Sequence, residues 1–583
     1  MCALALLAGA CSNNDSSSKP TSSKAPGGSA QTAEQNSGLF PADIVNQPVH
    51  DGTPTEGGAI TWGVESDILD VSPNQNVIQP SDVQMAYAVF DPLLTYGDPD
   101  DAKFKGQPVT DNTDHRYNQL ADSLVSDNDD LQHWTLTLRK GVKFSNGKPL
   151  TAQEVVDHTK WVMASPECAC ATNAKNITSV TAEGDLTVKY TLAEPVVAFP
   201  SQLTGSGLGW ITESSARGDE HKPDIDKLVG AGPFEYESHT GDSYTVVKNP
   251  YYYGTDHAND DAKLPYLDKI TFTPLADSVT RLQAVQSGSV QIMGTADTSN
   301  LVGAKKDAGL KVQPAQGSSA TILVTNLTHP PFGVEPKPGE SAQETAIRSL
   351  DDPDAVKARE AFVYSINRNE INQKYYKGAR VPAYGFFPTS SPWYNPDGQL
   401  PRFDKAKATE LVDELKAKGM APTVNALCIN TPEASGIFQI LKSQGEAVGI
   451  HAKLRQVEQA ILVTTLLSGT GDIPWDTACF RSAQLSDPDG IYGGLITGGP
   501  TNLVKYSRND VDTWLNEARQ TNDKAKRKEL YDKIQVQVSK DKFVIPLLFD
   551  YWGNVFAKNI SGLSTPSPGS LGIIRPGTLY RTK

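Results

Sequence analysis

Cysteine thiols have the widest choice of chemistry in this sequence, because they can bind metal, form disulfides or carry a lipid. The six cysteines are Cys2, Cys11, Cys168, Cys170, Cys428 and Cys479. The CAC run at 168–170 is too closely spaced for a zinc site, whose ligands need two or more residues between them. Cys428 and Cys479 lie in apolar, strand-like runs. They suit either a disulfide outside the cytoplasm or two buried thiols, and the sequence leaves both alternatives open. Whether Cys168 and Cys170 form a disulfide is also left open.

Cys11 stands between an apolar run, Ala3 to Ala10, and a serine-rich tract. The run is too short for a membrane-spanning helix, which needs about 20 residues, but it suits a secretory signal. A cysteine directly after small residues resembles the bacterial lipobox, although Ala8 stands where leucine is usual. The tract is too polar to fold by itself and suits a flexible tether. We therefore predict a signal remnant at 1–10, lipidation of Cys11 and a tether at 11–57; the alternative is a disordered N-terminus with a chance thiol.

Composition narrows the class of protein. The chain has 583 residues, with 53 basic and 68 acidic side chains and a formal net charge of −15. This length allows two or more domains, and the charge argues against binding of nucleic acid or of an anionic membrane surface. No apolar stretch approaches the roughly 18 residues of a membrane helix. A lipid on Cys11 would then hold an extracytoplasmic protein at the outer face of the cell membrane, on the periplasmic side.

The local signatures of catalysis are missing. The run TGSGLG at 204–209 has the wrong spacing for a nucleophile elbow, and the nine histidines include no pair at i, i+4. No P-loop or dinucleotide-binding fingerprint is present. DPDG at 487–490 supplies two acids of a calcium loop without the rest, so a turn is the simpler interpretation. These absences favour a binding protein without metal or cofactor, with an extracellular hydrolase as the alternative.

The elements that would position such a site are legible at 134–163. Trp134, Leu136 and Leu138 alternate with threonines, which is the period of a half-buried strand. A turn follows, and the motif TAQE then predicts a helix in which Thr151 and Glu154 form a capping box. A similar alternation of strands and helices recurs at 268–293 and 404–448. Strands alternating with helices predict an α/β fold with partly parallel sheets.

Four segments together resemble family 5 of the extracellular solute-binding proteins, the peptide- and nickel-type receptors of ABC importers. The run WTLTLRKGVKFSNGKPLTAQEV resembles the family signature F-x-L-R-x-G-V-K-F-x-D-G-x-P-x-T-A-x-D-V. In the expected order, the other segments are AYAVFDPLLTYG (86–97), VGAGPFEYESHTGDSYTVVKNPYYYG (229–254) and AREAFVYSINRNEI (358–371). The match extends from about residue 57 to the C-terminus.

The resemblance implies a two-lobed α/β fold with mixed sheets that closes on its ligand like a Venus flytrap. The first lobe would comprise 58–325, with an extra subdomain near 98–228, and would be completed by 553–583. The second lobe would span 326–552, with chain crossings near ILVTNL and DYWGNVF. Such receptors are no enzymes; they work with the permease subunits of an ABC importer, and we expect a monomer.

The segment that binds the peptide's ammonium in this family departs from the family pattern in this chain. Peptide receptors hold the ligand's α-ammonium with an aspartate in a segment like W-x-A-D-Y-x-D-P, and the corresponding run here is FRSAQLSDP at 480–488. Gln484 replaces the aspartate and Arg481 the aromatic residue. Arg481 could bind a carboxylate or phosphate in bidentate fashion. Alternatively it faces solvent, and Asp487 or Asp489 takes the ammonium; both readings stay open.

Two further segments lie where the resemblance places the cleft. In YGFFPTSSPWYNP, Phe386, Phe387 and Trp393 would pack on the ligand, or belong to the core. In GVESDILD, Glu65, Ser66 and Asp67 are the other candidates. We therefore predict a receptor for a peptide or peptide-like solute, with an acidic or sugar-like solute as the alternative ligand.

Overall fold

The computed structural model describes most of the chain after the N-terminal segment. The described residues are 40, 45–68, 71, 73, 80–96, 116–165, 174–205, 207–217, 225–256, 259, 261–389, 391–420, 422–468, 473–482, 487–499, 501–564, 566 and 572–583. The predictions for residues 1–39, including Cys11, and those for Cys168, Cys170 and Gln484 lie outside the described residues.

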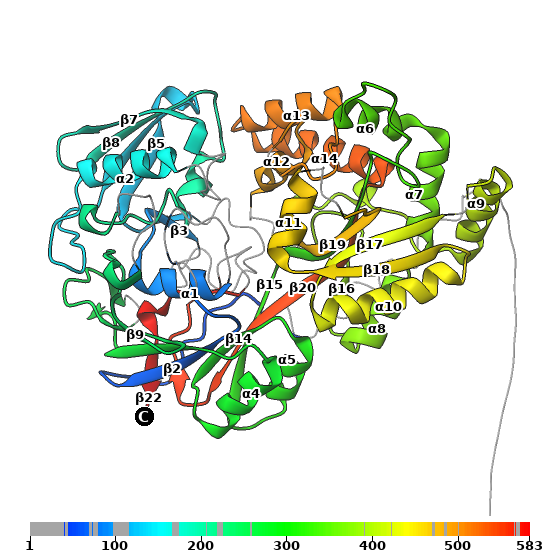
Figure 1. Cartoon of the computed structure of the whole chain (residues 1–583). Coiled ribbons are helices and arrows are strands. Elements are labelled where there is room, and N and C mark those ends of the chain that lie inside the picture. Colours follow the sequence, from blue (N-terminus) through cyan, green and yellow to red (C-terminus); the bar gives the residue numbers. More distant parts are fainter. Residues whose placement is uncertain are drawn as a thin grey trace, which may run out of the picture. The chain divides into compact units, whose positions relative to one another are not determined.

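A mixed sheet of 11 strands forms the centre of the fold (Figure 1). In order across it lie β18 (His451–Val457), β17 (Thr423–Ile429), β19 (Thr477–Ser482), β15 (Leu310–Thr325), β20 (Val544–Ala557), β14 (Ile292–Thr295), β2 (Ala59–Val64), β13 (Lys269–Pro274), β10 (Ser243–Lys248) and β9 (Phe234–Thr240). The short strand β16 (Val381–Pro382) pairs with β20. β2 is parallel to β13 and β14, and β17 is parallel to β18 and β19, so the predicted mixture of parallel and antiparallel pairing is confirmed.

The buried side chains divide into two groups where β15 and β20 run antiparallel to each other. The buried members of the clusters in one group come from residues 40–304 and 551–580, and we call this part the first lobe. The clusters of the other group draw on residues 320–549, which we call the second lobe. The limits of the lobes inferred from the sequence stay a prediction, but these cores change over at the two strands that the sequence singled out as crossings.

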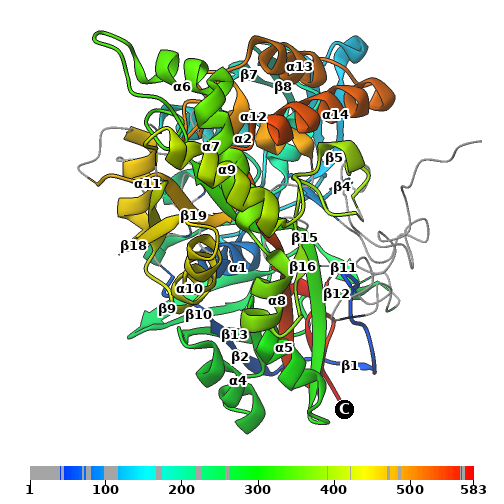
Figure 2. The ribbon, with the colours of Figure 1, turned by 90° about the vertical axis from the view of Figure 1, so that its right-hand side faces the viewer.

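The first lobe contains its own smaller sheet, with strand order β5–β6–β8–β7. Its elements are β5 (Ala121–Ser126), β6 (His133–Leu138), α2 (Ala152–Ala164), β7 (Ile177–Glu183) and β8 (Thr187–Leu192). α1 (Pro80–Val89), α4 (Ser278–Ser287) and α5 (Thr298–Lys305) belong to the rest of the lobe. Both α4 and α5 contact β14, and Figure 2 shows them near β2. Short strands complete it: β1 (Pro54–Thr55), β3 (Leu94–Tyr96), β4 (Arg116–Asn118), β11 (Thr255–Asp256), β12 (Ala262–Lys263), β21 (Ile560–Ser561) and β22 (Tyr580–Thr582).

The start of α2 agrees only in part with the predicted capping box. Thr151 Oγ1 accepts a hydrogen bond from the Glu154 backbone N–H at 3.3 Å, as expected for an N-cap. A capping box would also require the Glu154 carboxylate to reach back to the Thr151 N–H. The carboxylate instead pairs with Arg217. Arg217 is largely buried, and burial of a guanidinium demands an acid partner more strongly than the helix end does. The reciprocal half of the predicted box is therefore wrong.

Helices surround the sheet of the second lobe. They are α6 (Ala342–Asp351), α7 (Pro353–Ser365), α8 (Arg368–Tyr376), α9 (Lys405–Ala417), α10 (Pro432–Glu446), α11 (Gln459–Ser468), α12 (Tyr492–Leu495), α13 (Asn509–Arg519) and α14 (Lys524–Asp541). The predicted cap of α9 is present, since Asp404 Oδ1 accepts from the Lys407 N–H at 3.0 Å. Among the described residues, no helix has both the length and the apolar character to cross a membrane.

Cys428 and Cys479 form a disulfide, which resolves one alternative that the sequence left open. Cys428 lies in β17 and Cys479 in β19, and the two residues face each other in the parallel register of these neighbouring strands. Both side chains belong to a buried cluster of the second lobe. The bridge therefore fastens β19 to the lobe's core just before Arg481.

Candidate functional site

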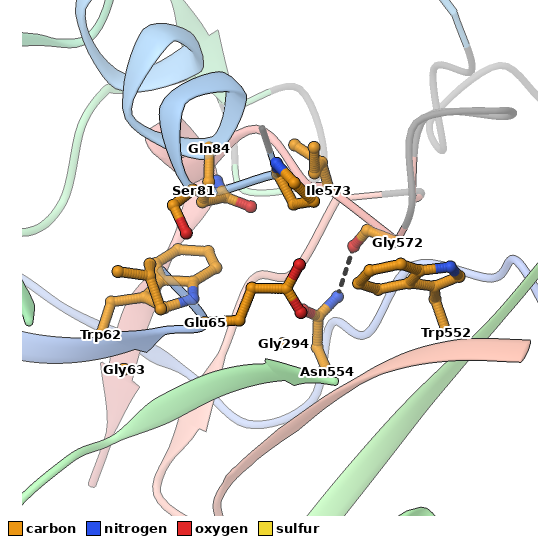
Figure 3. Close-up of a pocket in the computed structure, with 12 residues that line it drawn as sticks. Trp62, Gly63, Glu65, Ser81, Gln84, Gly294, Trp552, Asn554, Gly572 and Ile573 are labelled. Atoms are coloured by element: carbon orange, nitrogen blue, oxygen red, sulfur yellow. Dashed lines mark hydrogen bonds between the residues drawn. The ribbon is translucent and has the colours of Figure 1, made fainter. Parts of the chain in front are cut away.

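A pocket lies at the carboxyl end of β2 in the first lobe, with about 350 Å³ of empty space that includes open solvent at its mouth (Figure 3). Its walls come from β2 and the residues after it, the first turn of α1, β14, β20 and the loop at 572–573. The lining residues are Trp62, Gly63, Val64, Glu65, Pro80, Ser81, Gln84, Gly294, Trp552, Asn554, Gly572 and Ile573. The edge at the carboxyl ends of parallel strands is the usual place for ligands in α/β sheets.

Two glycines, Gly63 and Gly294, line the base of this pocket and leave its space unfilled because they have no side chain. Gly294 in β14 faces Asn554 in β20 as a strand partner, and a Cβ on Gly294 would lie 3.7 Å from Asn554 Oδ1. A Cβ on Gly63 would lie 3.3 Å from the Val290 side chain and 3.4 Å from that of Arg281. Gly63 therefore allows Arg281 to pack directly beneath β2, and Gly294 leaves open the space above Asn554.

Hydrogen bonds hold the polar lining in place. Asn554 donates through Nδ2 to Gln313 Oε1 at 3.0 Å and to the Gly572 carbonyl at 2.9 Å. Gln84 binds both polar backbone groups of Ile574, which ties α1 to the loop at 572–573. Because both Asn554 donor hydrogens are used, the oxygen of its side chain is the group that it can offer to a ligand.

The Glu65 carboxylate points into the pocket, between Trp62 and Trp552 and beside Asn554 in the view of Figure 3. Arg281 packs against Gly63 of β2, is 2 % exposed and donates to the carbonyls of Leu275 and Ala276. Burial lowers the pKa of Arg281, and the charge of Glu65 opposes that shift. The positive charge of Arg281 thus partly offsets the negative charge of Glu65, whose carboxylate faces the pocket.

Ser66 and Asp67, also predicted as ligand contacts, shape the loop after β2. The Ser66 N–H and hydroxyl both donate to Ser81 Oγ, at 3.1 and 2.9 Å. Asp67 accepts from the Ile68 N–H at 2.9 Å and from the Tyr244 hydroxyl at 3.2 Å. Burial, together with the charge of Asp67, raises the pKa of Tyr244 to about 12. Neither Ser66 nor Asp67 lines the pocket, so contact of these two residues with ligand stays a prediction.

The aromatic candidates of the second lobe lie in its core. Phe387 and Trp393 are 2 % and 7 % exposed, and Phe386 packs against the same cluster. The Trp393 ring lies edge-on to Tyr531, with 5.6 Å between the ring centroids. The alternative reading of these residues as core therefore agrees with their burial, and a contact with ligand stays a prediction.

The end of β19 carries the other group of predicted residues. Arg481 belongs to β19, where its backbone pairs with Thr321, but its side chain lies outside the described residues, as does Gln484. Asp487 is 4 % exposed and accepts from Arg527 Nη2 at 2.8 Å and from Nη1 at 3.3 Å. Asp489 pairs with Arg519 at 3.0 Å. Both acids proposed as substitutes for Gln484 therefore already have a cationic partner inside the second lobe.

Residues 116–492 match the sequence profile described as "Bacterial extracellular solute-binding proteins, family 5 Middle". The chain belongs to this family. The match covers more than half of the sequence and identifies a solute-binding protein, so the alternative of an extracellular hydrolase is dropped.

Relatives and solved structures agree with this assignment. The glutathione-binding protein GsiB of Escherichia coli (strain K12) is 26% identical over 455 residues, which are 76% of this chain and 83% of that protein. The ABC transporter substrate-binding protein CtaP of Listeria monocytogenes has a TM-score of 0.71 at 23% identity, covering 91% of this chain and 100% of the other. The oligopeptide-binding protein AppA of Bacillus subtilis, solved with a nonapeptide, has a TM-score of 0.72 at 18% identity, covering 91% and 100%. The predicted two-lobed fold is thus confirmed.

The sequence did not indicate several of the residues that line this pocket. Trp552 and Asn554 come from β20, almost five hundred positions after Glu65, and Gly572 follows them. Their one sequence signal is the run DYWGNVF, which the family resemblance marks as a chain crossing and not as part of a pocket. Among the described residues, no group of three His, Cys, Asp or Glu side chains could hold a metal ion.

Proposed function

We propose that this solute-binding protein captures a peptide or peptide-like solute and delivers it to the permease of an ABC importer, and that a cationic group of the solute enters the pocket of the first lobe. The observation that carries the proposal is the Glu65 carboxylate at the carboxyl end of β2, pointing into a pocket with an indole on either side (Figure 3).

The chemistry of the lining favours a cation over an anion. Glu65 offers a charged acceptor, and Asn554 offers an amide oxygen because its two N–H donors bind Gln313 and Gly572. Trp62 and Trp552, which are 1 % and 4 % exposed, contribute apolar walls on either side of the carboxylate (Figure 3). A charge-assisted hydrogen bond to Glu65 would be shorter and stronger than a neutral one. An α-ammonium is the cation that every unblocked peptide carries.

The names of relatives support a peptide ligand. GsiB proteins are named for glutathione, which is itself a small peptide, and AppA and the Helicobacter pylori protein DppA were solved with peptides. The protein AgaA was solved with agropinic acid, so the fold also serves solutes other than peptides. For this chain, ion pairs in the second lobe bind Asp487 and Asp489. Glu65 lines the pocket of the first lobe, and we assign the ammonium to Glu65 on that ground.

Binding would be coupled to closure of the two lobes. Contacts made by the solute only when both lobes reach it would shift the population toward the closed state. The first-lobe pocket would supply the cation contact, and the end of β19 would supply the opposing surface. We also propose that a monomer is held at the outer membrane face through a lipid on Cys11; Cys11→Ser should then move the protein from the membrane to the soluble fraction without a change in folding.

Titration calorimetry with tri-alanine and N-acetylated tri-alanine tests the ligand class and the pocket together. We expect acetylation to weaken binding, because it removes the cation. Glu65→Gln should weaken binding of the free peptide by about 10- to 100-fold, the range of one charge-assisted hydrogen bond, and should change binding of the acetylated peptide little. Glu56→Gln is the matched control, since Glu56 lies on the same lobe with its side chain 68% exposed.

The outcomes separate the two parts of the proposal. If neither peptide nor glutathione binds, the ligand is not a peptide and the acidic or sugar-like alternative gains support. If free peptides bind tightly and Glu65→Gln has no more effect than Glu56→Gln, the assignment of the ammonium to Glu65 is wrong. Equal affinity for the free and acetylated peptides would instead point to Arg481 and a carboxylate.

A further inference from the structure

A buried cluster around Arg380 lies where the two lobes meet along β15 and β20. Arg380 directly precedes β16, whose Val381 pairs with Phe549 of β20, and the side chain of Arg380 is 1 % exposed. Val381 packs against a core cluster of the first lobe and also against one of the second lobe. The segment at 380–381 is therefore in contact with both cores.

The guanidinium of Arg380 binds groups in several directions at once. Nη1 lies within hydrogen-bond distance of three acceptors, at 2.7 Å from Asp550 Oδ1, 2.9 Å from the Tyr376 hydroxyl and 3.3 Å from Thr321 Oγ1, which share its two hydrogens. Nη2 lies 3.1 Å from Glu433 Oε1, and the guanidinium carbon lies 3.9 Å from the centroid of the Tyr376 ring. Asp550 is fully buried, so its charge depends on Arg380 for compensation.

One contact of Arg380 is with a residue of the first lobe. Nη2 donates to the backbone carbonyl of Ala296 at 3.2 Å. Ala296 lies in the first lobe, between β14 and the start of α5, whereas Tyr376 and Glu433 belong to helices of the second lobe. Asp550 and Thr321 lie on β20 and β15, the two strands that join the lobes. A single planar group thus connects both lobes and both joining strands.

We propose that Arg380 is a positioning residue for solute capture: its guanidinium limits the range of angles between the lobes and so lowers the entropy that closure costs. The planar, forked geometry of arginine allows five donors to fix several partners at once, which a lysine ammonium cannot do. Burial protects these contacts from screening by salt. A hinge with fewer accessible angles loses less conformational freedom when a solute closes it. This inference needs the two-lobed fold and does not depend on which solute binds.

A second contact between the lobes provides the place to measure this effect. The Val197 N–H, in the first lobe, donates to the carbonyl of Arg519 at the end of α13 at 2.8 Å. Exposed Glu194 and Gln520 flank the contact. Spin labels introduced at these two positions through unnatural amino acids would report the opening of the lobes by electron–electron double resonance, without use of the native cysteines.

Arg380→Lys keeps the charge beside Asp550 but loses the fork. In the full-length protein without solute, we expect this variant to broaden the distribution of distances between labels at 194 and 520, with a shift of its mean to longer distances. The control is Arg359→Lys. Arg359 is equally buried, but it donates only to carbonyls of the second lobe, those of Asp541, Phe332, Ser349 and Leu350. The control should lose thermal stability and leave the distance distribution unchanged.

Tyr376→Phe is the milder variant, in case Arg380→Lys does not fold. It removes the hydroxyl that joins Arg380 to Glu433 and keeps the ring and the ion pair with Asp550. We expect a smaller broadening in the same direction. If folded Arg380→Lys and Tyr376→Phe both give the distribution of the Arg359→Lys control, Arg380 only stabilises the fold and the proposal is wrong. The affinity of Glu65→Gln for peptide tests the proposed cation site, and the label distances test the role of Arg380. Either proposal can therefore fail while the other holds.

Discussion

Glu65 and Asp487 are two acids at comparable places in the two lobes, each just beyond a strand of the central sheet, and their surroundings differ. Glu65 follows β2 and points into a pocket (Figure 3), and its charge acts on the buried Arg281 beneath the strand. Asp487 follows β19 and forms an ion pair with Arg527 in which both partners are buried. Position near the end of a strand therefore does not make an acid a ligand contact. The neighbours that the fold brings to the carboxylate decide between recognition and structure.

Removal of Arg527 should have the largest effect on stability, because it breaks the buried ion pair with Asp487. Arg527→Ala leaves Asp487 buried without its partner, so we expect the free energy of unfolding to fall by about 3 to 5 kcal/mol. Denaturant unfolding measures this loss. The double variant Arg527→Ala, Asp487→Ala should recover part of the loss because no charge stays buried; a double variant that is no more stable than the single one would show that Asp487 does not need Arg527.

Glu213 is a third acid that sharpens the comparison, because its side chain is fully buried and its partner Lys148 is half exposed. Burial alone would raise its pKa, but hydrogen bonds from Lys148, Ser214 and Ser215 lower the pKa from 4.5 to about 2. The ionised form therefore stabilises the fold above pH 4.5, and this contribution is lost as the pH falls toward 2. Since solvent screens part of the pair, we expect about 2 kcal/mol at neutral pH.

Unfolding of wild type and Glu213→Gln between pH 2 and pH 7 measures this contribution. The stability gap between the two proteins should be widest at neutral pH and should narrow through the interval in which Glu213 becomes protonated. A gap that stays constant across the whole series would show that the carboxylate acts through its shape and not through its charge.

Filling the pocket tests the other half of the comparison with a smaller effect. Gly294→Ala adds a methyl group 3.7 Å from Asn554 Oδ1, an ordinary contact that the fold can accept. We expect affinity for tri-alanine to fall about tenfold, which corresponds to about 1.4 kcal/mol, with stability unchanged. Gly303→Ala on α5, where a Cβ meets only Leu282 at 3.9 Å, is the control and should leave affinity as it is. Equal affinities for both variants would exclude the pocket from solute binding.

A helix cap far from either acid gives the smallest expected change and a baseline for the others. Thr151→Ala removes the oxygen that accepts from the Glu154 N–H, and we expect a loss of about 1 kcal/mol in unfolding free energy. Peptide affinity should not change. Gln153→Ala, on the exposed side of the same helix, should alter stability by less than about 0.5 kcal/mol. A loss of affinity for folded Thr151→Ala would assign a binding role to the start of α2.

Local chemistry was enough to determine the pieces of the fold. The alternation around Trp134, the cap at Thr151 and the start of α9 after Asp404 depend on neighbours within a few positions, and each appears in the structure. The run of family motifs gave the two-lobed α/β architecture, which the solved relatives confirm. The same resemblance placed the chain crossings near ILVTNL and DYWGNVF, which lie in β15 and β20.

Only the tertiary structure decided which of the predicted side chains can meet a solute. Glu65, Trp552 and Asn554 converge because β2, β14 and β20 are neighbours in one sheet, although β20 lies almost five hundred positions after β2. Asp487 was an equally good candidate in the sequence until α14 brought Arg527 to within 2.8 Å of it. The Cys428–Cys479 bridge was equally open until the parallel register set the two residues opposite each other. The strength of an ionic contact depends on distance and on exclusion of water, and a sequence specifies neither until the chain has folded.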